Sequence, residues 1–90
     1  MLALKTTGQF RKDLKLAKKR GYKLELLEEV LEILQNEEAL PAKFKDHPLI
    51  GQYAGFRECH IQPDWLLIYI VDNNQLVLTT VRTGTHSDLF

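Results

Sequence analysis

The sequence of 90 residues contains a single cysteine, Cys59, so no internal disulfide can form. A lone thiol is compatible with a reducing compartment. The longest apolar run, from Trp65 to Val71, is far shorter than the roughly 20 residues that a membrane-spanning helix needs. The N-terminal residues lack the long apolar segment and the cleavage site of a signal peptide. These absences predict a cytoplasmic protein with no membrane partner.

The sequence also lacks an excess of charge, with 12 lysines and arginines against 12 aspartates and glutamates. It has no internal repeat, linker or low-complexity segment, and its apolar content of 44% is that of a globular protein. A chain of this length supplies material for one hydrophobic core. Residues 1–90 are therefore predicted to form a single domain, with any function on its surface.

The charge balance conceals a segregation along the chain. The first quarter carries a single acid, Asp13, among many bases, and the next segment carries glutamates without a base. The bases are Lys5, Arg11, Lys12, Lys15, Lys18, Lys19, Arg20 and Lys23, and the glutamates are Glu25, Glu28, Glu29, Glu32, Glu37 and Glu38. A basic helix could bind a nucleic-acid backbone with release of counterions. Charge alone favours the simpler interpretation of two solvated helix faces that attract each other.

Apolar periodicity predicts one strand and two helices in the N-terminal half. The strand covers residues 1–5. Thr6 or Thr7 can cap a following helix, and Gly21 can end it. A second helix is predicted over residues 23–36, and the short turn between the two helices predicts an antiparallel hairpin.

The C-terminal half begins with a proline-containing loop over residues 37–51, in which one short turn is expected at 42–44. Alternating apolar residues then predict three antiparallel strands over residues 55–61, 65–71 and 76–82. Pro63 suits a turn after the first of these strands, and Asn73-Asn74 suits a two-residue hairpin after the second. The predicted fold class is α+β, with the helical hairpin packed on one face of an antiparallel sheet.

Four polar residues stand at strand ends of this predicted sheet. If Cys59 and Ile61 point toward the helices, strand alternation places His60 on the opposite, open face. Alternation along the last strand allows Arg82 to share that face. Asp64 lies in the turn after His60, and His86 follows the last strand. We therefore expect His60, Asp64, Arg82 and His86 to lie near one another.

Such a set of side chains could cleave RNA without a metal. The reaction needs a base for the 2′-hydroxyl proton, a cation for the charged phosphorane and an acid for the departing 5′-oxygen. Histidine suits both proton transfers because its ordinary pKa is about 6.5. Arginine suits the phosphate because its guanidinium can donate paired hydrogen bonds and stays charged.

Other interpretations of these residues are less specific. A lone histidine or aspartate at a strand end is more often a solvated or turn-capping group. The spacing of the histidines and Asp64 matches no tetrahedral metal motif, so no metal cofactor is expected. Cys59 lies in mid-strand on the expected core side, which argues against a thiol nucleophile. Trp65 and Tyr69 are expected to pack in the protein rather than stack on bases.

Three stretches of the chain carry a resemblance to a known family: "FRKDLKLAKKRG", "KDHPLIGQYAGFRECHIQPDWLLIYI" and "VRTGTHSDLF". They closely resemble the YafQ-like branch of the RelE/ParE superfamily, the toxins of bacterial type II toxin–antitoxin modules. The resemblance covers nearly the whole chain. It implies a microbial-RNase fold and an endoribonuclease that cuts messenger RNA in the A site of the 30S ribosomal subunit. It also implies a partner, an antitoxin that wraps the toxin and commonly binds operator DNA through its own N-terminal part.

The resemblance carries the family's functional positions over to six residues of this chain, and each is present. His86 is expected to be the general acid, and either Asp64 or His60 the general base. Arg82 would hold the phosphate. The remaining two positions are His47, expected to position the substrate or stabilise the transition state, and the terminal Phe90, expected to stack on a base.

The basic first helix is the expected contact with ribosomal RNA, through Lys15, Lys18 and Lys19. Two alternatives remain open beside the ribosome-dependent mRNA interferase. One is a ParE-like toxin of the same fold that poisons gyrase and does not require His60, Asp64 and His86. The other is a module without catalytic activity that only binds an antitoxin or RNA.

Overall fold

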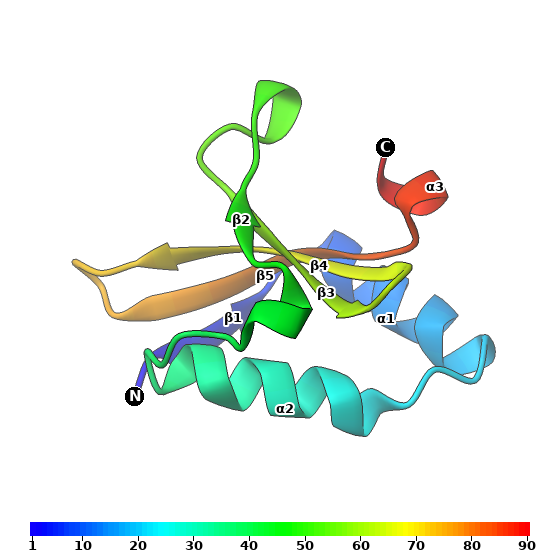
Figure 1. The fold of residues 1–90 in the computed structure, drawn as a ribbon, viewed down its shortest axis with the longest axis horizontal. Helices are drawn as coiled ribbons and strands as arrows, with labels where there is room; N and C mark the ends of the chain where they lie inside the picture. The colour runs from blue at the N-terminus through cyan, green and yellow to red at the C-terminus, as the bar shows by residue number, and fades with distance from the viewer.

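Five strands form one mixed sheet in the order β1-β5-β4-β3-β2 in the computed structural model, which describes all 90 residues (Figure 1). Strands β3, β4 and β5 pair antiparallel, as expected, whereas β1 runs parallel to β5. The strands are β1 (Ala3–Thr6), β2 (His47–Pro48), β3 (Arg57–Gln62), β4 (Trp65–Asp72) and β5 (Val77–Gly84). The sheet is therefore mixed at one edge, where β1 and β5 are not joined by a hairpin and run in the same direction.

Two long helices, α1 (Gly8–Lys19) and α2 (Leu24–Gln35), lie on one face of the sheet. Of the two predicted caps for α1, the structure uses Thr7, whose hydroxyl oxygen accepts a hydrogen bond from the Phe10 amide. Gly21 ends the same helix with a φ of 79°, a conformation that suits glycine, and the chain reverses there into α2. The predicted helical pair is confirmed.

The main core lies between these helices and the sheet. Its centre is Trp65, which packs against Tyr22 and donates a hydrogen bond to the Thr83 hydroxyl. Tyr69 is buried in the same core, so both aromatic residues pack inside the protein as expected. The buried members are Leu2, Phe10, Ala17, Leu27, Val30, Leu34, Phe44, Cys59, Ile61, Trp65, Leu67, Tyr69 and Leu78. We call this side of the sheet the covered face.

The opposite side, which we call the open face, has only a small apolar cluster. Leu66 and Ile68 of β4 are fully buried there, together with Leu89 of the short C-terminal helix α3 (His86–Leu89). Cys59 and Ile61 belong to the covered face, so His60 between them points to the open face, as alternation along β3 predicts. No helix of the structure is long and apolar enough to cross a membrane.

Strand β2 was expected to be part of a loop. It has two residues, one of them a proline, and is too short to show an alternating pattern. His47 pairs with Glu58 of β3 and Pro48 with Arg57. The loop also contains two short 3₁₀ helices, η1 (Ala42–Phe44), which was predicted, and η2 (Gly51–Tyr53), which was not.

The predicted two-residue hairpin at Asn73-Asn74 is wrong. Four residues separate β4 from β5, because Asp72 pairs with Val77. The Asp72 carboxylate accepts hydrogen bonds from the amides of the second and third loop residues, and this closes the turn locally. Leu76, predicted to begin the strand, instead takes the positive φ of the turn, at 57°.

Candidate active site

Three histidines from three separate segments lie in a row on the open face. The His47 and His60 rings are 6.2 Å apart between centroids, and the His60 and His86 rings are 5.7 Å apart. Pairing of β2 with β3 brings His47 to this row, and the end of β5 brings His86. Sequence analysis named all three residues, but the neighbourhood of His47 and His60 depends on the unpredicted strand β2.

Asp64 joins the row through His86. Its Oδ1 atom lies 2.7 Å from His86 Nδ1 and accepts a second hydrogen bond from the His86 amide at 3.0 Å. These two hydrogen bonds hold the pKa of Asp64 below its usual value. The carboxylate therefore stays charged and can orient the imidazole and stabilise its protonated form. Both side chains are more than half exposed to solvent.

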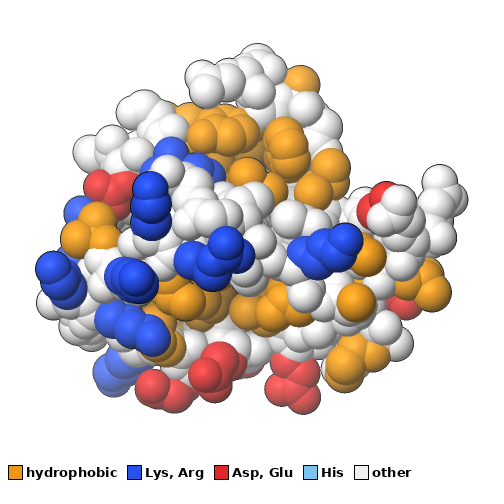
Figure 2. All heavy atoms as spheres, turned by 180° about the vertical axis from the view of Figure 1, so that it is seen from behind, with side chains coloured by type: hydrophobic (Ala, Val, Ile, Leu, Met, Phe, Trp, Pro, Cys, Tyr) orange, Lys and Arg blue, Asp and Glu red, His pale blue; other side chains and the backbone are white.

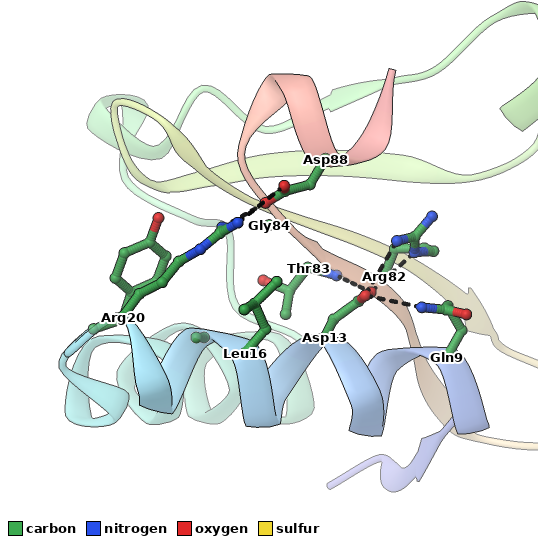
Figure 3. Close-up of a pocket in the computed structure, with 10 residues that line it drawn as sticks. Gln9, Asp13, Leu16, Arg20, Arg82, Thr83, Gly84 and Asp88 are labelled. Atoms are coloured by element: carbon green, nitrogen blue, oxygen red, sulfur yellow. Dashed lines mark hydrogen bonds and ion pairs between the residues drawn. The ribbon is translucent and has the colours of Figure 1, made fainter.

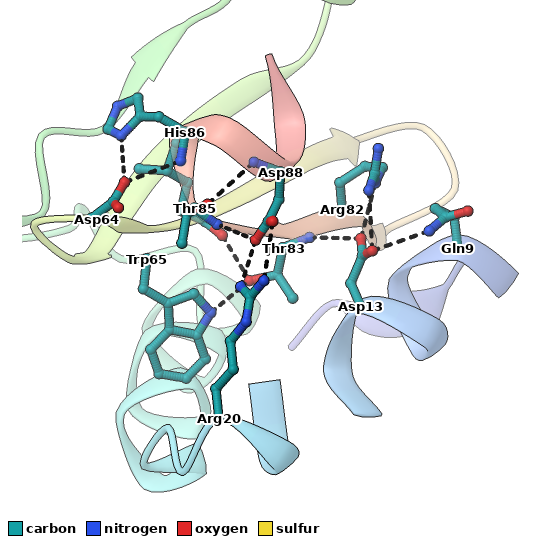
Figure 4. A network of polar contacts seen from close by, with 11 residues as sticks. Gln9, Asp13, Arg20, Asp64, Trp65, Arg82, Thr83, Thr85, His86 and Asp88 are labelled. Atoms are coloured by element: carbon teal, nitrogen blue, oxygen red, sulfur yellow. Dashed lines mark hydrogen bonds and ion pairs between the residues drawn. The ribbon is translucent and has the colours of Figure 1, made fainter. Parts of the chain in front are cut away.

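The short helix that carries His86 is fixed at its start. The Thr85 hydroxyl accepts a hydrogen bond from the Asp88 amide, while the Asp88 carboxylate accepts one from the Thr85 amide (Figure 4). Arg20 at the end of α1 binds the same carboxylate at 2.6 Å. A side chain at Gly84 would collide with Asp88, since a Cβ atom there would lie 2.9 Å from its Oδ2. The turn before His86 thus requires glycine.

Sequence analysis missed Glu58, a carboxylate whose side chain is only 5% exposed on the open face. Its Oε1 atom lies 3.4 Å from His47 Nε2 and 3.5 Å from His60 Nε2. Alternation along β3 already placed Glu58 on the same face as His60. The sequence signal that could have revealed it was an acid two residues before a candidate histidine on the same strand, where its burial calls for a polar partner.

The hydrogen on the His47 ring can be assigned from its partner. His47 Nδ1 lies 2.6 Å from the carbonyl oxygen of Lys45, which can only accept a hydrogen bond, so Nδ1 carries a hydrogen. Nε2 then donates toward Glu58 only when the ring is charged.

Arg82 reaches the open face by a route that strand alternation did not predict. The expected alternation placed Leu78, Thr80 and Arg82 on one face, but Leu78 belongs to the covered face. A register shift leaves Val81 without a partner on β4, so that Thr80 pairs with Tyr69 and Arg82 with Ile68. Because cross-strand partners share a face, this bulge turns Arg82 to the open side. The predicted position of Arg82 is correct, although the reason given for it was not.

Strand pairing also sets the open-face residues in two lines that run across the strands and are distinct from the histidine row. One cross-strand line runs through His47, Glu58, Ile68 and Arg82, and the next through His60, Leu66 and Gly84. Adjacent strands are about 4.8 Å apart, so Glu58 and Arg82 are separated by roughly 10 Å across the buried Ile68.

Phe90 ends the chain beside the site. Its side chain is 63% exposed and meets the ring of Tyr53 edge to face at a centroid distance of 5.8 Å. Tyr53 also contributes, after Asp13, to raising the pKa of Arg82. An exposed aromatic ring held at the rim of the site can stack on an unpaired base.

Lys15, Lys18 and Lys19 are exposed on α1 and take no part in the histidine row. Figure 2 shows lysines and arginines spread across the side on which α1 lies, with acidic side chains below them. The segregation seen in the sequence is therefore real in space. The basic surface and the histidine row are separate regions of the molecule.

His47, Glu58 and His60 could also hold a metal ion, because one ligand atom from each lies within 4.8 Å of the others. Two imidazoles and a carboxylate form a donor set that suits zinc, copper or nickel. The spacing argument against a metal considered Asp64 and not Glu58. The acid–base chemistry of the histidines and Asp64 requires no metal, and Cys59 is unsuited to nucleophilic attack because its burial raises the pKa of the thiol to about 12.

Comparison with known proteins agrees with this fold. The family model for the bacterial toxin YafQ of type II toxin–antitoxin systems matches residues 2–90. The mRNA interferase toxin YafQ of Escherichia coli K12 is 45% identical over 93% of this chain and 90% of its own length. The chain belongs to the YafQ family of bacterial toxins. The family and the enzyme class expected from the motifs are confirmed.

Solved structures show the same fold. A metal-bound toxin from Helicobacter pylori superimposes with a TM-score of 0.94 at 47% identity, with both chains fully covered. YafQ in the Escherichia coli DinJ–YafQ complex superimposes with a TM-score of 0.89 at 42% identity, over 100% of this chain and 99% of the other. One relative is thus a metal-bound toxin, and another was solved with the protein DinJ.

Proposed function

We propose that this chain is the toxin of a type II toxin–antitoxin module and that it cuts messenger RNA on the ribosome by metal-independent acid–base catalysis. The observation that carries the proposal is the Asp64–His86 pair facing His60 on the open face, with Arg82 on the cross-strand line next to that of His60. The 2′-hydroxyl oxygen attacks the neighbouring phosphorus as its proton leaves. The bond from phosphorus to the 5′-oxygen then breaks as that oxygen gains a proton.

His86 is the general acid. When its ring is charged, Nδ1–H donates to Asp64, and this leaves Nε2–H free to protonate the departing 5′-oxygen. Asp64 is occupied in this way by two hydrogen bonds from His86, which assigns it the role of orienting the acid.

His60 is then the general base, a choice that the sequence alone left open. Nε2 lies 3.5 Å from the Glu58 carboxylate and can donate its hydrogen toward it, which leaves Nδ1 without a hydrogen in the neutral ring. Nδ1 of the same ring can accept the proton of the 2′-hydroxyl. His47 lies on the other side of Glu58, with its Nε2 3.4 Å from the same carboxylate oxygen.

Arg82 binds the phosphate, and Phe90 holds a base beside it. A guanidinium stays charged at any physiological pH and can donate two parallel hydrogen bonds to the nonbridging oxygens. These contacts strengthen as charge develops in the phosphorane, so they favour the transition state over the substrate.

The partner of this toxin is a small antitoxin, since a relative of nearly full coverage was solved in complex with DinJ. Operator DNA is reached only through that antitoxin. Because the substrate is a message on the 30S A site, the toxin acts in the cytoplasm. Exposed Lys15, Lys18 and Lys19 on α1 contact ribosomal RNA, and this electrostatic contact makes cleavage dependent on the ribosome.

The test is His86→Ala, expressed from an inducible promoter. We expect loss of growth arrest and of the cleavage products seen by primer extension on a message, with a roughly 10²- to 10⁴-fold drop in cleavage rate. Folding and antitoxin binding should remain intact. Growth arrest that persists in this variant would favour a gyrase-directed toxin, and wild-type protein that cuts no message would favour a binding module.

A further inference from the structure

A groove of about 260 Å³ separates α1 from the end of β5 and from α3 (Figure 3). At its centre the only acid of the basic N-terminal segment, Asp13, points away from solvent toward β5. Its side chain is 9% exposed, although Lys12 precedes it and Lys15 follows two positions later. Asp13 has no role in the chemistry described above.

Asp13 accepts hydrogen bonds from both edges of the groove. Its Oδ2 lies 2.9 Å from Arg82 Nε and 3.2 Å from the Thr83 amide, and its Oδ1 lies 3.1 Å from Arg82 Nη2. Gln9, one turn earlier on α1, donates to Oδ1 at 3.0 Å. Burial alone would raise the pKa of Asp13, but the hydrogen bonds from Arg82, Gln9 and Thr83 outweigh it and lower the pKa. The carboxylate is thus ionised and fixed on two strand residues.

The pairing uses one edge of the guanidinium and leaves the neighbouring edge free of Asp13. Arginine has five N–H donors in one plane. Asp13 takes the Nε hydrogen and one Nη2 hydrogen, so both Nη1 hydrogens and the second Nη2 hydrogen remain. One Nη1 hydrogen and the second Nη2 hydrogen lie on the neighbouring edge of the plane, which is the edge that can grip a phosphate with two parallel hydrogen bonds.

We propose that Asp13 is a positioning residue that holds Arg82 in the plane in which its free edge meets the scissile phosphate. This inference rests on the proposed function of Arg82. Without the carboxylate, the guanidinium would rotate among several rotamers, and its two phosphate contacts would have to be ordered in each catalytic cycle. The Thr83 amide adds to the effect by tying the same carboxylate to the backbone beside Arg82.

A competing interpretation makes the opposite prediction. If Asp13 occupied the edge that the phosphate needs, it would inhibit the toxin, and its removal would raise activity. Figure 4 shows the carboxylate of Asp13 between α1 and the backbone of β5, bound to Arg82, Thr83 and Gln9. The free edge of Arg82 is therefore compatible with simultaneous binding of Asp13 and phosphate.

The first experiment measures cleavage of a message on ribosomes by Asp13→Asn, Arg82→Ala and the double variant. We expect Asp13→Asn to lower kcat about 10- to 100-fold with little change in KM. In the Arg82→Ala background the same change should cost less than about 2-fold, since Asp13 acts through Arg82. Additive losses, or a kcat of Asp13→Asn at or above that of the wild type, would overturn the proposal.

A charge-preserving variant, Asp13→Glu, keeps the carboxylate on α1 but moves it by one methylene. Cleavage should fall here also, because the guanidinium shifts with its partner. Wild-type cleavage by Asp13→Glu would mean that charge alone matters, and the positioning role would be rejected. Arg57→Gln is the matched control, since it breaks a similar ion pair, with Asp46 at 3.1 Å, away from the open face, and should leave kcat unchanged.

The second experiment does not depend on catalysis. The Arg82 Nε–H signal in a nitrogen-15 NMR spectrum should exchange slowly with solvent in the wild type and quickly in Asp13→Asn. Rapid exchange in the wild type would show that the pair does not form in solution and would refute the inference. If Arg82→Ala leaves cleavage intact while the slow Nε–H signal is present, the proposed role of Arg82 fails, although the pair itself exists.

Discussion

Strands β3, β4 and β5 contribute residues to both the covered and the open face of the sheet, but the two faces differ in burial and polarity. The covered face carries thirteen buried core residues, and its one thiol is held inert by burial. The open face has only three buried apolar residues and leaves the Asp64–His86 pair more than half exposed. One face therefore supplies the stability and the other can hold polar groups in geometries that stability alone would not select.

The largest effect is expected on the covered face. Leu67 is fully buried there, and Leu67→Ala should lower the free energy of unfolding by about 2–5 kcal/mol through lost burial and a residual cavity. Urea unfolding monitored by circular dichroism measures this change in the free energy of unfolding. Leu76→Ala, at a residue 55% exposed, is the control and should change stability by less than about 0.5 kcal/mol.

Glu58→Gln should show the reverse pattern on the open face. It removes the carboxylate that lies between His47 and His60 and orients the His60 ring, so cleavage should fall about 10- to 100-fold. Unfolding free energy should change by no more than about 1 kcal/mol, because glutamine has the same shape. Primer extension and urea unfolding give the two values. A variant with full cleavage would remove Glu58 from the site.

The basic surface of α1 is a third region, which affects neither stability nor the chemical step. Reversal of Lys15, Lys18 and Lys19 to glutamate should lower ribosome-dependent cleavage about 10-fold at physiological salt and flatten its salt dependence. Reversal of Glu25, Glu28 and Glu32 to lysine on α2 is the matched control and should not impair cleavage. Unchanged cleavage by the α1 variant would place the ribosome contact elsewhere.

A smaller effect concerns acid stability. The pKa of Asp13 is lowered in the folded protein, so its ion pair contributes stability above about pH 4 and loses it only as pH falls below that value. The difference in Tm between wild type and Asp13→Asn should stay constant from pH 7 to about pH 4 and shrink below it. A difference that vanishes near pH 6 would point to a histidine instead.

No effect is expected when transition metals are removed. A chelator that spares magnesium, and so preserves the ribosome, should leave the cleavage rate unchanged, because His60 and His86 supply the two proton transfers. A loss of cleavage that zinc or copper restores would show that the His47–Glu58–His60 cluster works as a metal site.

Local patterns predicted most of the fold. Thr7 and Gly21 delimit α1, and alternation around Cys59 placed His60 on the correct face, because capping and strand periodicity depend on a few neighbouring residues. The prediction of a two-residue hairpin after β4 was wrong because of another local contact. Asp72 closes a four-residue loop with its own carboxylate, and that contact competes with the turn preferred by asparagine.

By itself, the sequence determined the family and the two faces of β3, and it singled out His60, Asp64, Arg82 and His86 as candidate site residues. Only the tertiary structure decided that β2 brings His47 against a buried Glu58 and that the unpaired Val81 turns Arg82 to the open face. It also decided that the Asp64 carboxylate pairs with the His86 ring. These features depend on pairing between distant segments. Strand pairing and bulges are fixed by long-range packing, which a local pattern of residues does not encode.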